Sequence, residues 1–235
     1  MTGEHAEYGS VRDLIGRLRD VPVVPASSAL LLVDLQYLDA SADGEQAVRA
    51  RRDGTWADIA PYFERVAGTV VPAAARLIAA ARDRAMPVMF TRCVSFTPGA
   101  RDNGRRFREF GIVVAPDSRD ADILDELDRR PGDLVWNKTT ASVFLSTNID
   151  RTLRQMGIDT LVVGGVVTSG CVESAVRDAC DLDYGVVLVD DACADRTTEL
   201  HEHALRRLHR NFAIVRSAED VLAELVASTP PRRSE

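Results

Sequence analysis

Short apolar runs alternate along the chain with segments whose apolar residues recur at helical spacing. Six runs have the length of buried strands: residues 29–33, 87–91, 134–136, 161–163, 186–189 and 212–215. The first run, Ala29 to Val33, is apolar at every position. Such a run is typical of a strand whose sheet is covered on both faces.

The segments between these runs predict helices. Pro72 can begin one helix, Thr147 and Asp150 resemble a capping box that Gly157 would close, and Ser217 can cap the last helix. Apolar residues at helical spacing also mark residues 120–129, 171–183 and 200–210. Because strand and helix alternate throughout, the pattern predicts an α/β fold. We expect a doubly wound, mostly parallel six-stranded sheet with helices on both faces.

No internal repeat or linker divides the 235 residues, so one core domain is expected. We predict an N-terminal extension over residues 1–27, a domain over residues 28–227 and a tail over residues 228–235. No stretch approaches the about 18 apolar residues of a membrane span, and the N-terminus lacks the apolar segment of a signal peptide. We therefore expect a cytoplasmic protein with no membrane association.

Lys and Arg number 29 against 36 Asp and Glu, for a formal charge of −7. This acidity argues against general binding to nucleic acid or to anionic membranes. One local arginine cluster is interpreted as a solvated loop: Arg101, Arg105, Arg106 and Arg108. The four cysteines are expected to be thiols, and without a CxxC pair they do not predict a structural zinc site.

Three polar residues stand where predicted strands end. Asp34 follows the first strand, Lys138 ends the third, and Cys171 lies just past the fourth. Ligands of doubly wound sheets bind beyond the carboxyl ends of the strands, at the point where the strand order reverses. In the common order 3-2-1-4-5-6, Asp34 and Cys171 would face one crevice, and the loop after the third strand would bring Lys138 inward.

These residue types suit nucleophilic catalysis. A helix N-terminus and a nearby ammonium both favour a thiolate. A carboxylate can take the thiol proton and return it to a leaving group, while backbone N–H groups in the glycine-rich turn before Cys171 hold an oxyanion. Each residue alone has an ordinary explanation: a packed cysteine, a turn-capping aspartate and a surface lysine. Their joint placement at strand ends favours catalysis.

Several blocks of sequence resemble the isochorismatase-like cysteine hydrolase family. They are Leu31–Gln36 (LLVDLQ), Asn137–Phe144 (NKTTASVF), Gly164–Glu173 (GGVVTSGCVE) and the run Ala175–Ala192. The resemblance spans roughly residues 28–216. It implies a doubly wound α/β fold, a homodimer or homotetramer, no cofactor, and Asp34, Lys138 and Cys171 as catalytic triad. It further implies a cis peptide at Val166–Val167 and an oxyanion hole made by the backbone N–H groups of Val167 and Cys171.

Two departures narrow the activity that the resemblance implies. Metal-dependent nicotinamidases of the family place histidines between the Asp and Lys blocks, whereas the histidines here are His5, His201, His203 and His209, so no metal is expected. Isochorismatases proper lack the nucleophilic cysteine, which is present here. We therefore expect an amidohydrolase that cleaves a non-peptide C–N bond of a small linear amide or ureide through a thioester.

The turn Thr-Ser-Gly-Cys171 is similar to N-carbamoylsarcosine and maleamate amidases, whereas Cys171-Val-Glu-Ser resembles ureidoacrylate and biuret hydrolases. The substrate thus stays open. For its pocket we propose Tyr37, Arg92 and Phe144, with Arg92 pairing with a substrate carboxylate. A structural ion pair for Arg92 and core packing for Phe144 remain the alternatives.

Three other functions remain open. They are isochorismatase-type hydrolysis of a vinyl ether, a non-catalytic binding protein of the same fold, and a redox-sensing thiol protein.

Overall fold

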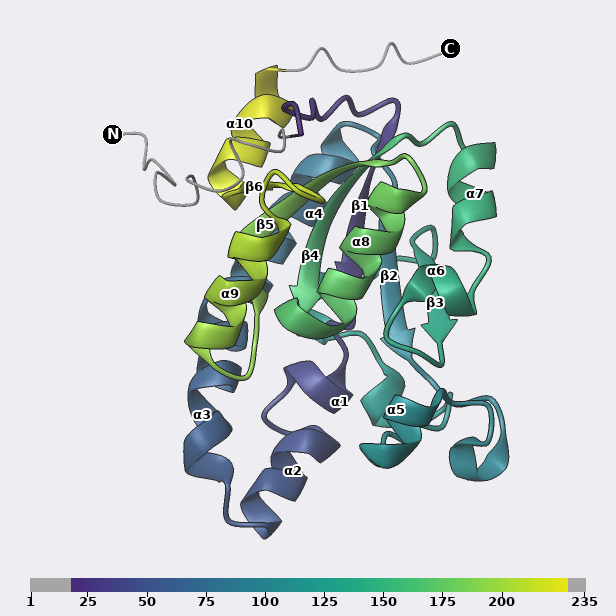
Figure 1. The fold of residues 1–235 in the computed structure, drawn as a ribbon, viewed down its shortest axis with the longest axis vertical. Coiled ribbons are helices and arrows are strands. Elements are labelled where there is room, and N and C mark those ends of the chain that lie inside the picture. The colour runs from purple at the N-terminus through teal and green to yellow at the C-terminus, as the bar shows by residue number, and fades with distance from the viewer. Residues whose placement is uncertain (1–17, 228–235) are drawn as a thin grey trace.

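The apolar runs form one parallel sheet in the computed structural model, which describes residues 18–227 (Figure 1). The strands are β1 (Ser28–Val33), β2 (Val88–Cys93), β3 (Leu134–Lys138), β4 (Thr160–Val166), β5 (Gly185–Ala194) and β6 (Ile214–Arg216). Their order is β3-β2-β1-β4-β5-β6, and every neighbouring pair is parallel. The predicted six-stranded doubly wound sheet is confirmed, with its reversal of strand order between β1 and β4.

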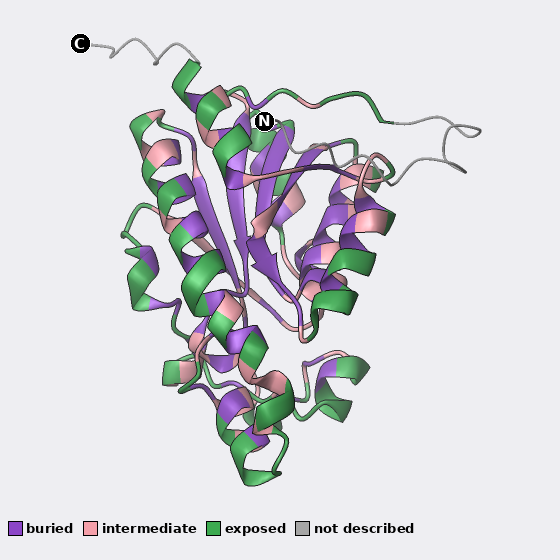
Figure 2. Cartoon of the chain, turned by 90° about the vertical axis from the view of Figure 1, so that its left-hand side faces the viewer, coloured by how far each residue is buried: buried purple, intermediate pink, exposed green. Residues whose placement is uncertain are grey.

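Helices cover both faces of this sheet, as predicted. The α-helices of the described residues are α1 (Tyr37–Ala40), α2 (Glu45–Arg52), α3 (Trp56–Arg65), α4 (Val71–Asp83), α5 (Arg105–Glu109), α6 (Val143–Ser146), α7 (Ile149–Gln155), α8 (Glu173–Asp181), α9 (Thr198–Leu208) and α10 (Ala218–Ala227). Leu30 and Leu32 of β1 point to one face and pack with α3, α4 and α10. Leu31 and Val33 point to the other and pack with α7, α8 and α9. Figure 2 shows the strands buried between the two layers.

The carboxyl ends of the central strands point toward α1, α2 and α5 (Figure 1). Gly165, near the end of β4, has a φ of 125°, and a Cβ there would lie 2.0 Å from the carbonyl oxygen of Val33. Only glycine lets β1 and β4 approach so closely at this point. Gly165 therefore allows close packing of β1 against β4 at the point where the strand order reverses.

The helix predicted over residues 120–129 does not form. The chain makes two separate 3₁₀ turns instead, Arg119–Ala121 and Asp125–Leu127. Ile123 pairs with Gln36 in an isolated antiparallel bridge, and Asp128 has a left-handed φ of 45°. Leu124 and Leu127 are nevertheless buried in the core, so helical spacing here reflects burial of an irregular segment rather than a helix.

Pro72 lies in the first turn of α4, as predicted, although α4 continues an earlier helix. Residues from Trp56 to Asp83 form one helical run, in which a π-helical turn, Val66–Val70, joins α3 to α4. The π turn ends two residues before Pro72, whose ring nitrogen has no N–H to donate. A widened turn is a known way to accommodate such a defect.

The described part of the predicted N-terminal extension packs on the domain. The Val23 N–H donates to Glu224 Oε1 at 2.9 Å, and Arg216 donates to the carbonyl oxygen of Val21 at 2.8 Å. Residues 1–17 and the tail at 228–235 lie outside the described residues, and the domain boundaries stay a prediction. Among residues 18–227, no helix combines the length and apolar character that crossing a membrane requires.

Candidate active site

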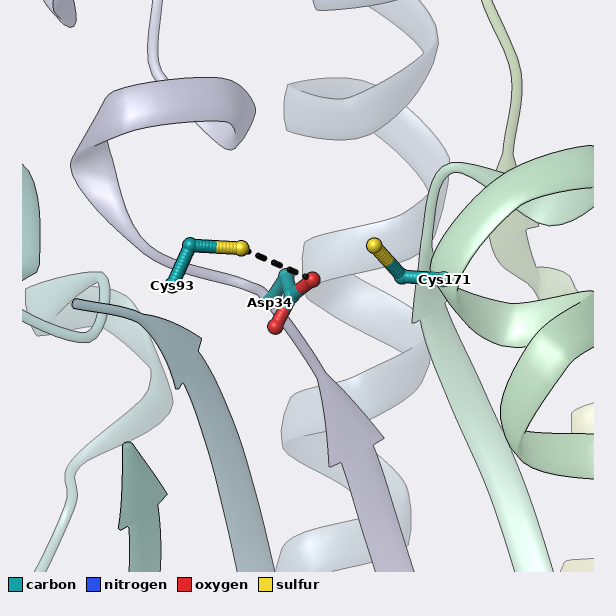
Figure 3. Close-up of side chains that lie close together, drawn as sticks. All are labelled: Asp34, Cys93 and Cys171. Carbon is teal, nitrogen blue, oxygen red and sulfur yellow. Dashed lines mark hydrogen bonds between the residues drawn. The ribbon is translucent and has the colours of Figure 1, made fainter. Parts of the chain in front are cut away.

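Asp34 directly follows β1 and adopts a left-handed φ of 55°, a conformation that aspartate tolerates better than most residues. Its carboxylate is buried and accepts hydrogen bonds from two sides. The Thr91 hydroxyl donates to Oδ1 at 2.7 Å, and the Lys138 ammonium lies 2.8 Å from Oδ2. These contacts aim the carboxylate across the end of the sheet, where it lies between the sulfurs of Cys93 and Cys171 (Figure 3).

Lys138 is the last residue of β3, in register with Cys93 of β2. Lys138 ends the third strand, as predicted, but the expectation that a loop brings it inward is wrong. β3 is two strands from β1, about 10 Å away, and the long lysine side chain crosses most of that gap. Its Nζ donates to the sulfurs of Cys171 at 3.2 Å and Cys93 at 3.3 Å, and to the carbonyl oxygen of Thr140 at 3.1 Å.

Cys171 lies in a π-helical turn, Thr168–Val172, that leads into α8. The peptide bond Val166–Val167 before this turn is cis, as the family resemblance implies. Cys171 is half-buried, and both it and Val167 line a cavity of about 460 Å³. The structure thus brings Asp34, Lys138 and Cys171 together, and it places the two residues of the predicted oxyanion hole at one cavity wall.

The surroundings of Lys138 and Cys93 fix the protonation state of each side chain. Burial alone would lower the pKa of Lys138, but the charges of Asp34, Cys171 and Cys93 together hold that pKa well above its usual value. Lys138 is therefore a permanent ammonium. The hydrogen bond with Cys171, burial and the Asp34 carboxylate raise the pKa of Cys93 well above its usual value. Cys93 is therefore a thiol, which donates to Asp34 Oδ2 at 3.4 Å.

Asp34, Cys93 and Cys171 offer three ligand atoms that all lie within 4.8 Å of one another. These are donors that a soft divalent metal accepts. The Lys138 ammonium, however, already contacts the carboxylate and both sulfurs, and would repel a second cation. The donor set accordingly fits the lysine and does not fit a metal ion.

Sequence reasoning missed Thr91 and Cys93. Both lie on β2 and contact Asp34, whereas Arg92 between them was chosen as a site residue. Successive side chains of a strand point to opposite faces. The register of β2 with β3 pairs Cys93 with Lys138 and so puts Cys93, rather than Arg92, on the side of Lys138; the sequence alone does not give that register.

Arg92 lies apart from the Cys171 cavity. Its Nε donates to Asn137 Oδ1 at 2.6 Å and its Nη1 to the carbonyl oxygen of Ala121 at 2.9 Å. It lines a separate cavity of about 430 Å³. The alternation of side chains along β2 accounts for this placement, because Thr91 and Cys93 take the side that faces Asp34. A role for Arg92 in substrate binding stays a prediction that this placement does not support.

Tyr37 and Phe144 are also absent from the lining of the Cys171 cavity. The Tyr37 hydroxyl donates to Asp125 Oδ2 at 3.1 Å, and the Arg119 guanidinium stacks 3.7 Å from its ring centroid. Phe144 packs against Tyr184, with ring centroids 6.0 Å apart. Their predicted pocket roles likewise gain no support. The apolar lining comes instead from residues that sequence reasoning did not select: Leu38, Ile59, Phe107, Phe110, Ile112 and Leu200.

A buried histidine supports the turn that carries Cys171. The Arg65 Nη2 donates to His201 Nε2 at 3.2 Å, so Nδ1 carries the proton and donates to the Thr168 hydroxyl at 2.8 Å. In the same turn, the Ser169 N–H donates to Asp195 Oδ2 at 2.6 Å. Burial and the Arg65 charge lower the pKa of His201 to about 4, against a smaller opposing effect of Asp195. His201 is thus neutral at physiological pH.

This histidine predicts a loss of stability in mild acid. Between pH about 6.5 and about 4 the unfolded chain binds a proton at His201 that the folded protein excludes. Its contribution is fully present above pH 6.5 and decreases as the pH falls to 4, by up to about 3 kcal/mol. Urea unfolding between pH 4 and 7 should therefore show a shallower pH dependence in His201→Gln, and an unaltered one in His203→Gln, whose histidine is exposed. Equal slopes in wild type and His201→Gln would contradict the assignment.

A parallel α/β sheet with a thiol, an ammonium and a carboxylate at its switch point defines a class of candidate hydrolases, and comparison with known proteins gives the family. The model of the isochorismatase domain family matches residues 28–220. A ureidoacrylate amidohydrolase RutB of Methylobacterium radiotolerans is 32% identical over 238 residues, covering 94% of this chain and 87% of that protein. The RutB of Pantoea ananatis is 31% identical over 212 residues, covering 83% and 80% respectively.

Solved structures share the fold. A cysteine hydrolase from Pseudomonas syringae pv. phaseolicola superposes with a TM-score of 0.75 at 22% identity, covering 89% of this chain and 97% of that one. The N-carbamoylsarcosine amidase of Thermoplasma acidophilum superposes with a TM-score of 0.65 at 24% identity, covering 82% and 97%. The chain belongs to the isochorismatase-like cysteine hydrolase family.

Proposed function

We propose that this protein is an amidohydrolase that cleaves a non-peptide C–N bond of a small linear amide or ureide through a thioester on Cys171. One observation carries the proposal: the Cys171 sulfur, 3.2 Å from the Lys138 ammonium, lines a cavity of about 460 Å³, a size typical of small-molecule sites. The relatives named ureidoacrylate amidohydrolase support this chemistry.

In the proposed reaction, Asp34 takes the Cys171 proton and the sulfur attacks the substrate carbonyl carbon. Lys138 stabilises the negative sulfur, and the N–H groups of Val167 and Cys171 hold the oxyanion. As the C–N bond breaks, protonated Asp34 returns its proton to the leaving nitrogen. Asp34 then deprotonates the water that attacks the thioester, and the acid product and the thiol are released.

Isochorismatase-type hydrolysis of a vinyl ether is the alternative reaction, and a non-catalytic protein is the alternative class. The first requires no thiol, yet a sulfur, an ammonium and a carboxylate meet here in one cluster. The second leaves unexplained why a buried ammonium is held against a half-buried thiol at a cavity wall. The homodimer or homotetramer and the cytoplasmic location expected from the sequence stay predictions.

A substrate panel tests the proposal. We expect ammonia release from carbamoyl and linear amide compounds, and no hydrolysis of the vinyl ether of isochorismate. Intact-protein mass spectrometry after rapid acid quench should detect an acyl adduct, and peptide mapping should place it on Cys171. Turnover of isochorismate without ammonia release from any amide would favour the ether hydrolase. No turnover of any compound by folded protein would favour a binding or redox-sensing protein.

A further inference from the structure

Cys93 is a buried thiol in the catalytic cluster that the proposed reaction leaves without a role. Its sulfur lies within 4.8 Å of the Cys171 sulfur and of an Asp34 carboxylate oxygen (Figure 3), and the Lys138 Nζ donates to it at 3.3 Å. Its side chain also lines the Cys171 cavity. A cysteine that only filled space would need apolar neighbours alone, and Cys93 has these as well, including Phe107. The polar contacts therefore need an explanation beyond packing.

The position of Cys93 is fixed by the segment that follows β1. The Cys93 N–H donates to Gln36 Oε1 at 2.5 Å, and Gln36 Nε2 donates to the Cys93 carbonyl oxygen at 3.1 Å. Gln36 is fully buried and lies two residues after Asp34. Because one side chain holds both backbone groups of Cys93, the thiol is kept at a set distance from the Asp34 carboxylate.

The Lys138 ammonium has more acceptors around it than protons to donate. It has three N–H groups, and its four acceptors are Asp34 Oδ2 at 2.8 Å, the Thr140 carbonyl oxygen at 3.1 Å, and the sulfurs of Cys171 at 3.2 Å and Cys93 at 3.3 Å. Oxygen accepts more strongly than a neutral thiol, so the two sulfurs share the third N–H. A Cys171 thiolate takes this N–H, because a charged acceptor binds it more strongly than the neutral Cys93 does.

The proton of Cys93 can likewise go to either of two acceptors. The thiol donates to Asp34 Oδ2 at 3.4 Å, and its hydrogen bond with Cys171 is the largest cause of its raised pKa. Asp34 is the stronger acceptor while it is ionised. In the proposed reaction, however, Asp34 takes the Cys171 proton, and a protonated carboxyl accepts weakly. The Cys171 thiolate is then the stronger acceptor within reach of the Cys93 thiol.

We infer that Cys93 is a positioning residue whose thiol donates a hydrogen bond to the Cys171 thiolate once Asp34 has taken the Cys171 proton. This inference rests on the proposed function. Cys93 keeps its own proton throughout, and its S–H turns from the Asp34 oxygen to the Cys171 sulfur. Lys138 and Cys93 then both donate to the thiolate that attacks the carbonyl carbon. A donor must stay protonated, which agrees with a pKa of Cys93 well above its usual value.

The pH dependence of Cys171 alkylation tests this inference without any substrate. Iodoacetamide reacts with the thiolate, and peptide mass spectrometry gives the rate at Cys171. Cys93→Ala removes the donor, so the thiolate should form only at higher pH. The rate on the acid limb should fall about 10-fold, while the plateau at high pH should stay that of wild type. Cys93→Ser keeps a donor and should restore most of the rate, and Cys180→Ala, on α8 outside the cluster, should match wild type.

The other titratable groups around Cys171 are common to all these variants, so a difference between variants reports the side chain at position 93. Lys138 remains an ammonium, and His201, behind the turn, has a pKa of about 4 and stays neutral above about pH 5. The remaining charged groups at the sulfur and at the cavity walls are Asp34, Asp39, Arg106, Asp195 and Arg196.

An alkylation profile of Cys93→Ala that coincides with that of wild type would overturn the inference. A rate reduced by the same factor at every pH would do so too, because it indicates a structural role, as would a folded Cys93→Ser that behaves like Cys93→Ala. Should the alanine variant not fold, Cys93→Val, which fills the space without a donor, takes its place.

Turnover gives a second reading of the same inference. If amides release ammonia, the acid limb of kcat/KM should lie at higher pH in Cys93→Ala than in wild type and Cys93→Ser, and equal limbs would overturn the inference while leaving the amidohydrolase intact. If no compound is hydrolysed, the proposed function fails, and alkylation alone decides the role of Cys93 by the outcomes above.

Discussion

Replacing Cys171 with alanine is expected to lower kcat on the order of 10⁴-fold or more, a loss typical of removing a covalent nucleophile. The half-buried side chain lies at the junction of two apolar clusters, and its loss leaves the ion pair of Asp34 and Lys138 in place. The folded structure should therefore persist. Ammonia release would measure the activity loss, and thermal unfolding should show a Tm within a few degrees of wild type.

Two further variants distinguish a nucleophile from a structural thiol. Cys171→Ser keeps the size and a hydrogen-bonding atom but should be nearly as inactive, because a serine hydroxyl ionises far less readily than a thiol. Cys180→Ala removes another half-buried cysteine, on α8, and should keep full activity. In Cys171→Ala the hydrogen bond with Cys171 is gone, but burial and the Asp34 carboxylate still raise the pKa of Cys93, so we do not expect Cys93 to take over. Turnover above about one per cent of wild type in folded Cys171→Ala would therefore remove the basis of the thioester mechanism.

The sheet and the location of the cluster were predictable because they follow from local features. A fully apolar run that ends in Asp34, and a glycine-rich turn before Cys171, identify strand ends without knowledge of distant contacts. Parallel strands then bring their carboxyl ends to one edge of the sheet. The strand order matched the common arrangement, so the residues at the ends of β1 and β4 met as expected.

The pocket was not predictable in the same way, because its walls come from segments that follow no period. Arg92 and Cys93 are adjacent in sequence, and only the register of β2 with β3 decides which of them meets Lys138. α5 is a five-residue helix in a long connection. Its position depends on the packing of the buried Phe107 ring near the Lys138 ammonium. No pattern in the local sequence separates Arg106 from Arg105, yet one lines the cavity and the other pairs with Glu109.

Replacing Lys138 with methionine is expected to destabilise the fold by about 3–5 kcal/mol and to remove activity. The lysine side chain is completely buried and pairs with Asp34, which is buried as well. Methionine fills a similar volume but leaves a carboxylate in the interior without its counter-ion, which is costly. Chemical denaturation would measure the free energy of unfolding, and ammonia release would measure turnover.

The double variant Asp34→Asn/Lys138→Met separates the charge from the packing. Removing both charges should bring the free energy of unfolding to within about 2 kcal/mol of wild type, since replacing a buried ion pair as a unit costs little. The Thr91 hydroxyl can still donate to the asparagine carbonyl oxygen, as it does to Asp34 Oδ1. Activity should stay absent, because neither the proton acceptor nor the ammonium beside Cys171 remains.

Each alternative outcome identifies a different cause. A double variant as unstable as Lys138→Met would assign the loss to packing around residue 138 rather than to an unpaired carboxylate. A Lys138→Met protein as stable as wild type would show that the buried Asp34 carboxylate does not require the Lys138 ammonium for the stability of the fold. Recovery of stability without recovery of turnover is the expected result. It would mean that the buried pair is retained for the chemistry at the Cys171 sulfur, since a neutral pair can hold this edge of the sheet together equally well.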